Sequence, residues 1–165
     1  MQDGVLRAPG GSKRFFLLKA ALDKLWKTDK QFSLDIYFKP TELSPYMKPH
    51  DRYTYPELGS VFDRMDLLIV PSIWYETFGY VVLEALSHGV PILMSGRVGA
   101  RDILAHGAGI VIEDITVEKL YDVLRRITYR QLADMNRIIL EEQEILTVQD
   151  MARIIEEICY DQRKT

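Results

Sequence analysis

Residues 71–84 read Pro-Ser-Ile-Trp-Tyr-Glu-Thr-Phe-Gly-Tyr-Val-Val-Leu-Glu, and the rest of the chain is organised around this stretch. The preceding residues 66–70, Asp-Leu-Leu-Ile-Val, form a short apolar run typical of a buried parallel strand. Pro71 ends that run because it has no N–H to donate within a sheet. Gly79 is expected to open a helix that residues 89–91, Gly-Val-Pro, close. Strand, polar loop and helix in this order predict an open α/β sheet, in which ligands bind beyond the carboxyl ends of the strands.

The predicted helix has a polar arc and an apolar arc, and its start is suited to an anion. Its first N–H groups, near Phe78, Gly79 and Tyr80, have no partners inside the helix and carry partial positive charge, which favours a phosphate. Glu76 in the loop and Glu84 one turn into the helix flank that place. Their carboxylates would accept hydrogen bonds from sugar hydroxyls. The alternative interpretation is a solvated helix face, with glycine present for packing.

The whole stretch resembles the signature of the retaining glycosyltransferases of family four, also called glycosyl transferases group 1. These enzymes have two Rossmann-like domains, the GT-B architecture. The matching residues are Glu76-Thr77-Phe78-Gly79, Glu84-Ala85, Gly89-Val90-Pro91 and the apolar run Ile92-Leu93-Met94-Ser95. A final Gly-Gly-x-x-Glu turn of the signature departs here, since Val98-Gly99-Ala100-Arg101-Asp102 keeps one glycine and has Asp in place of Glu.

This resemblance implies the site of a nucleotide-sugar donor in the C-terminal half of a GT-B fold. Glu76 would bind hydroxyls of the transferred sugar, and Glu84 would bind the ribose hydroxyls. Thr77, Phe78, Gly79 and Tyr80 would complete the donor site around the start of the helix. The complete enzyme would transfer a sugar from a nucleoside-diphosphate sugar to a saccharide, glycolipid or protein acceptor, with retention of configuration.

Two basic residues bracket a glycine-rich loop near the start of the chain. Arg7 follows a short apolar segment, and Lys13 lies six residues later, where a helix is predicted to begin. A lysine there opposes the helix dipole. In the resembling family, an arginine and a lysine with this spacing bind the donor diphosphate, which makes Arg7 and Lys13 catalytic candidates together with Glu76. Arg14 stands where the family usually has glycine, and the alternative is two exposed basic residues near a terminus.

Tyr53 and Tyr55 map to the segment that holds the nucleotide base in the resembling family. They lie in a loop rich in proline and tyrosine, residues 41–56, just before a predicted helix. Tyrosine rings can stack on a base, although surface and core tyrosines are more common.

Length and composition indicate one globular domain. The resemblance implies that residues 1–165 form a single Rossmann-like α/β domain, with a parallel sheet and helices on both faces. The net charge of −3 and the absence of a basic run give no support for a nucleic-acid partner. No apolar run has membrane length, so no transmembrane segment is expected, and the single cysteine, Cys159, suits a reducing, cytoplasmic compartment. The three histidines are scattered and no Asp-x-Asp motif occurs, so neither a metal nor a cofactor is expected.

The remaining elements are predicted from apolar periodicity and turn residues. A truncated strand is expected to end near Leu6, and further strands at 32–38, 52–54 and 109–112. Helices are expected at 13–27, 56–65, 101–106, 130–145 and 148–160, and one more begins after Thr116. Ser12 and Thr116 are the expected N-caps of the first helix and of the helix that follows residue 116.

In the resembling architecture, an N-terminal domain binds the acceptor, and the last helix docks on it. That domain has no counterpart in this chain, so we expect little transfer activity from the chain alone. The uncovered apolar surface, including the helix at about 148–160, favours a homodimer in isolation. The missing half would also be the place for a peripheral attachment to a membrane.

A different class of function stays open. The chain can be a degenerate, non-catalytic module that binds a partner subunit and regulates it, which the departures at Arg14 and at Val98–Asp102 favour modestly. A flavin or dinucleotide module is less well supported, because no Gly-x-Gly-x-x-Gly motif follows a strand.

Overall fold

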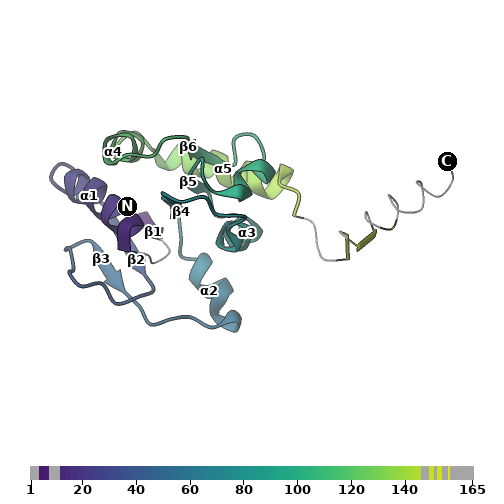
Figure 1. The fold of residues 1–165 in the computed structure, drawn as a ribbon, viewed down its shortest axis with the longest axis horizontal. Helices are drawn as coiled ribbons and strands as arrows, with labels where there is room; N and C mark the ends of the chain where they lie inside the picture. Colours follow the sequence, from purple (N-terminus) through teal and green to yellow (C-terminus); the bar gives the residue numbers. More distant parts are fainter. Residues whose placement is uncertain (1–3, 8–11, 146–148, 151, 154–155, 157–165) are drawn as a thin grey trace.

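The computed structural model describes residues 4–7, 12–145, 149–150, 152–153 and 156 (Figure 1). The strands are β1 (Gly4–Arg7), β2 (Phe32–Ile36), β3 (Met47–Pro49), β4 (Leu67–Val70), β5 (Ile92–Ser95) and β6 (Gly109–Ile112). The helices are α1 (Ser12–Trp26), α2 (Leu58–Phe62), α3 (Tyr80–Ser87), α4 (Val117–Leu124) and α5 (Tyr129–Glu142), with short 3-10 turns η1 (Tyr55–Glu57) and η2 (Gly99–Ile103).

The strands form one parallel sheet in the order β3-β2-β1-β4-β5-β6. β1 lies in the middle, where Leu6 pairs with Leu34 of β2 on one side and with Leu67 of β4 on the other. The chain runs outward from β1 in one direction and then returns to continue from β4 in the other. The carboxyl ends of β1 and β4 therefore form the switch point of the sheet, where a crevice opens in doubly wound folds.

Helices cover both faces of the sheet, and β4 shows how the two faces alternate. Leu67 and Ile69 pack into the cluster beneath α1 and α4, whereas Leu68 and Val70 pack into the cluster beneath α2, α3 and α5. Because both faces are covered, all four residues of β4 are buried, and the strand reads as a continuous apolar run. The predicted α/β class, with a parallel sheet and helices on both faces, is confirmed.

Several predicted elements are confirmed within a few residues, and α3 ends where the Gly89 turn was expected. Thr116 is the N-cap of α4, and its hydroxyl accepts a hydrogen bond from the N–H of Lys119 at 3.2 Å. Ser12 is the first residue of α1 instead of its cap. β2 ends at Ile36, two residues earlier than predicted.

The region between β2 and β4 differs most from the sequence prediction. The predicted strand at 52–54 is wrong, because the short strand in this loop is β3, Met47–Pro49, which pairs in parallel with β2. The predicted helix 56–65 is divided into η1 and a single helical stretch, α2, that stops at Phe62. The short helix expected at 101–106 is the 3-10 turn η2, and the predicted final helix at 148–160 falls largely outside the described residues.

Candidate functional site

The candidate site lies at the carboxyl ends of β1 and β4, the switch point of the sheet. Beyond β1 the chain leads into α1, and beyond β4 the loop of residues 71–79 leads into α3. Parallel strands bring these two connections to the same edge. The topology therefore places the start of α1 and the Glu76 loop, which lie more than 60 residues apart in sequence, next to one another.

Backbone hydrogen bonds hold the Glu76 loop against the turn that follows β5. The N–H of Glu76 donates to the carbonyl of Arg97 at 2.9 Å, and the N–H of Gly99 donates to the carbonyl of Glu76 at 3.0 Å. The N–H of Ala100 donates to the carbonyl of Phe78 at 2.8 Å. This short parallel bridge gives the loop a defined position although it belongs to no strand of the main sheet.

Two buried serines fix the loop where it leaves β4. The hydroxyl of Ser95, at the end of β5, donates to the carbonyl oxygen of Ser72 at 2.6 Å. The hydroxyl of Ser72 donates to Oε1 of Glu76 at 2.7 Å. Both serines are fully buried, so the partnership satisfies polar groups that burial would otherwise leave without water.

The carboxylate of Glu76 also forms an ion pair with the guanidinium of Arg14 in the first turn of α1. Both side chains are mostly covered, with 27% of Arg14 and 19% of Glu76 exposed. Glu76 is therefore a held, partly desolvated carboxylate rather than a solvated surface group. Arg14 and Ser72 are the residues that the sequence prediction did not connect to Glu76; a basic residue in the first turn of a helix, against the dipole, is the signal that points to such a partner.

Gly79 forms the start of α3 in a conformation that favours glycine. Its φ of 93° lies in the left-handed region, and a Cβ there would come within 3.0 Å of Val98 and 3.5 Å of Oε2 of Glu76. The second carboxylate oxygen of Glu76 thus lies close to the backbone at the N-terminus of α3. A negative charge close to that terminus is favoured by the helix dipole.

Along α3, the predicted polar and apolar arcs are confirmed by burial. Val82 and Ala85 are fully buried, whereas Tyr80 is 76% exposed and Glu84 is partly exposed. Among the residues that the structure describes, the carboxylate of Glu84 has no hydrogen bond or ion pair, which keeps it available to a ligand. The imidazole of His88, in contrast, already has partners within the protein. Its Nδ1 lies 2.9 Å from the carbonyl oxygen of Glu84, and its ring stacks on Phe62.

The other predicted site residues have a known place in the fold, and their roles stay predictions. Arg7 is the last residue of β1 and Lys13 the second residue of α1, so both belong to the switch-point edge; their side chains lie outside the described part of the structure. Thr77 is exposed, and the half-buried ring of Phe78 meets that of Tyr80 edge-on at 5.5 Å.

The two candidate base-binding tyrosines differ in their surroundings. Tyr53 is half-buried and its ring meets Tyr37 edge-on at 5.1 Å. Tyr55, which begins η1, is 85% exposed. Both follow β3 at the carboxyl edge of the sheet, on the same edge as Glu76.

The turn at Val98–Asp102, which departs from the family signature, supports the backbone of the Glu76 loop. Asp102, which stands at the signature glutamate, is exposed and pairs with Arg101 at 3.4 Å. Gly99 is the glycine that the turn keeps, and a Cβ there would overlap the carbonyl oxygen of Thr77. The close approach of this turn to the Glu76 loop therefore requires glycine at position 99.

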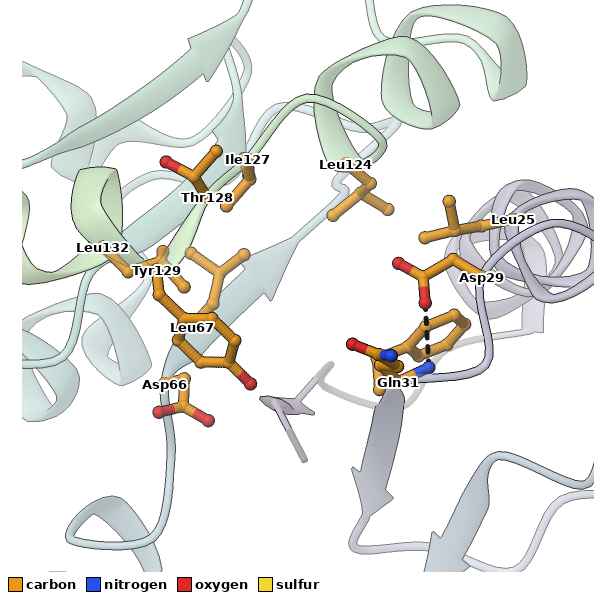
Figure 2. A pocket seen from close by; sticks show the side chains of 11 residues that line it. Leu25, Asp29, Gln31, Asp66, Leu67, Leu124, Ile127, Thr128, Tyr129 and Leu132 are labelled. Carbon is orange, nitrogen blue, oxygen red and sulfur yellow. Dashed lines mark hydrogen bonds between the residues drawn. The ribbon is translucent and has the colours of Figure 1, made fainter. Parts of the chain in front are cut away.

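Two hollows in the described part of the chain lie at the opposite, amino edge of the sheet. One of about 140 Å³ is lined by apolar side chains, including Leu25, Leu67 and Leu124, together with Asp29 and Asp66 (Figure 2). None of the predicted donor-site residues lines it. In the described part of the chain, no three His, Cys, Asp or Glu side chains are grouped closely enough to hold a metal, and no helix has the length and apolar content needed to span a bilayer.

Comparison with known proteins decides the family. The model of the family described as "Glycosyl transferases group 1" matches residues 49–141, which is more than half of the chain. The chain belongs to this family. The match runs from the last residue of β3 almost to the end of α5 and so includes the Glu76 loop and α3.

An uncharacterized glycosyltransferase of Methanocaldococcus jannaschii is 37% identical to this group 1 glycosyltransferase domain over 49 residues, which are 30% of this chain and 12% of the relative. The fold is similar to that of a glycosyltransferase from Rickettsia africae, with a TM-score of 0.72 and 15% identity over 96% of this chain and 47% of the other. It is also similar to Anabaena Alr3699/HepE in complex with UDP-glucose, with a TM-score of 0.67 and 16% identity over 96% of this chain and 49% of HepE.

The chain spans about half the length of these solved structures and a smaller share of the curated relative. The resemblance to a C-terminal GT-B domain of a group 1 glycosyltransferase is confirmed by the family match and the fold.

Proposed function

We propose that this chain is the donor-binding half of a retaining glycosyltransferase. The enzyme would transfer a sugar from a nucleoside-diphosphate sugar to a saccharide, glycolipid or protein acceptor. The observation that supports this most is the position of Glu76, whose carboxylate is held by Ser72 and Arg14 beside the start of α3 at the switch point of the sheet. A fixed carboxylate next to the N–H groups at the start of a helix suits a ligand that carries both hydroxyls and phosphate.

Each part of the donor has a proposed partner. Glu76 would accept hydrogen bonds from hydroxyls of the transferred sugar, and Glu84 from the ribose. The diphosphate would lie between them, at the N-terminus of α3, where the backbone of Gly79 allows close approach. Tyr53 and Tyr55 are proposed to border the base.

In the proposed mechanism, this half of the enzyme stabilises developing charge and supplies no general acid or base. The nucleoside diphosphate leaves as an anion, and Arg7, Lys13 and the N–H groups at the start of α3 would stabilise the charge that develops on it. The acceptor hydroxyl would attack from the same face from which the diphosphate departs and would give its proton to that diphosphate, which results in retention. No metal or cofactor is part of the proposal.

UDP-sugars are the first donors to test, since the HepE structure with a similar fold contains UDP-glucose. We propose that an acceptor-binding half completes the enzyme, and that this chain without it binds the donor weakly and transfers little sugar. We also propose that the uncovered surface leads the isolated chain to form homodimers.

Calorimetric titration with UDP, GDP, ADP and their sugar conjugates tests the proposal. We expect one nucleotide to bind, and Glu84→Gln to weaken it about tenfold. Glutamine keeps an oxygen acceptor but loses the charge, and so loses only part of a hydrogen bond worth about 1.5–3 kcal/mol. Glu118, exposed in the first turn of α4, offers a matched control, and Glu118→Gln should bind as the unchanged chain does.

The two outcomes separate the candidate functions. Nucleotide binding that Glu84→Gln leaves unchanged would contradict the proposed ribose contact. Failure of every nucleotide to bind would favour either the non-catalytic docking module or a donor site that forms only with the acceptor-binding half. Repeating the titration with that half present would separate these two.

A further inference from the structure

We infer that Arg14 is a positioning residue of the donor site, which orients the carboxylate of Glu76 toward the transferred sugar. The inference rests on the proposed function. It concerns a residue that the family signature does not supply, because the position after Lys13 is usually glycine in the resembling enzymes.

The placement of Arg14 requires a partner. It is the third residue of α1, where a positive charge is opposed by the helix dipole. Its guanidinium nevertheless lies with only 27% of the side chain exposed, which removes part of its hydration. The ion pair with Glu76 offsets both costs and connects the start of α1 to the loop beyond β4.

The contacts divide the Glu76 carboxylate into a held oxygen and an available one. Oε1 receives both the Arg14 guanidinium and the hydroxyl of Ser72. Oε2 lies toward Gly79, at the start of α3. Two donors on one oxygen fix the plane of the carboxylate, so the other oxygen keeps its direction toward the place where the proposal puts the sugar.

A guanidinium suits this role better than an ammonium. Arginine presents its donors in a rigid planar fork and is always charged, whereas lysine is a flexible point charge. Ser72 alone would hold Oε1 by a single neutral hydroxyl, which permits the carboxylate to rotate about the Cγ–Cδ bond of Glu76. Arg14 therefore reduces the orientational freedom that the carboxylate would otherwise lose when the sugar binds.

The test compares a nucleotide with its sugar conjugate in Arg14 variants. Calorimetric titration with UDP and UDP-glucose is made on the unchanged chain, Arg14→Gln, Arg14→Lys and Arg14→Gln combined with Glu76→Gln. We expect Arg14→Gln to weaken UDP-glucose about tenfold and to leave UDP within about twofold. Arg14→Lys should recover part of the loss, and adding Glu76→Gln should cost little more. Arg130→Gln, on the exposed start of α5, is the control for loss of one positive charge.

Each other result overturns the inference. Equal loss of UDP and UDP-glucose would make Arg14 a diphosphate ligand, and unchanged or tighter binding of UDP-glucose would make it a surface or blocking residue. Binding of neither compound by the unchanged chain would instead contradict the proposed function, and this inference with it. Thermal unfolding of each variant separates loss of binding from loss of the fold.

Discussion

At the scale of single residues, Gly99 and Gly96 offer a matched pair. A Cβ at Gly99 would overlap the backbone carbonyl of Thr77 in the Glu76 loop. Hydrogen bonds to the carbonyls of Glu76 and Phe78, on either side of Thr77, hold that part of the loop in place. A Cβ at Gly96 would instead meet the carboxylate of Glu113 and the guanidinium of Arg101, the ends of two flexible side chains that form an ion pair at the surface. The same added methyl group therefore meets a rigid neighbour at one position and a movable neighbour at the other.

We predict that Gly99→Ala lowers the free energy of unfolding by about 1–3 kcal/mol, because the loop must shift to make room. Gly96→Ala should change it by no more than about 0.5 kcal/mol, since Glu113 and Arg101 can move away and their exposed ion pair contributes little. Urea unfolding measures both. Equal losses in the two variants would show that the bridge between the Glu76 loop and the turn after β5 is not rigid.

At the scale of elements, Asp23 connects α1 to the loop before β3. Its carboxylate accepts hydrogen bonds from Lys19 at 2.7 Å and from the hydroxyls of Ser44 and Tyr46 at 2.8 Å. Burial raises the pKa of Asp23, but these hydrogen bonds together outweigh it and hold the pKa below its ordinary value of 3.8. Burial in turn raises the pKa of Tyr46, so the phenol stays protonated and can donate.

This connection has a defined dependence on pH. A carboxyl group whose pKa is lowered by folding stabilises the folded chain above its unfolded pKa, and that stability is lost as the pH falls through the folded pKa. We predict that Asp23→Asn lowers the free energy of unfolding at pH 7 and reduces its fall between about pH 5 and pH 2. Urea unfolding as a function of pH would contradict this if the variant and the unchanged chain lost stability in parallel.

The elements also show which parts of the fold can be predicted from sequence. β4 and α3 are predictable because their apolar patterns, Pro71 and Gly79 agree locally. β3 was misplaced because Met47–Pro49 pairs with β2 through the sheet, and a three-residue strand has too little pattern of its own.

At the scale of the whole molecule, the strand order makes a site from distant segments. Arg14 meets Glu76 only because β1 and β4 are neighbours in the sheet, although β2 and β3 lie between them in sequence. The sequence therefore predicts which residues follow each strand, and the family resemblance predicts the edge at which they gather. Neither predicts that Arg14, at a position where the family usually has glycine, forms an ion pair with Glu76, since that contact depends on three-dimensional packing.

The central claim is that a nucleotide-sugar donor binds at the carboxyl edge of the sheet, and chemical-shift mapping tests it most directly. The labelled chain is titrated with the nucleotide that binds best, and its backbone amide signals are followed by NMR. The account predicts that the largest shifts fall on residues 76–84 and on Arg14. Shifts gathered instead around the hollow at the amino edge, near Asp29, Asp66 and Leu124 (Figure 2), would contradict it.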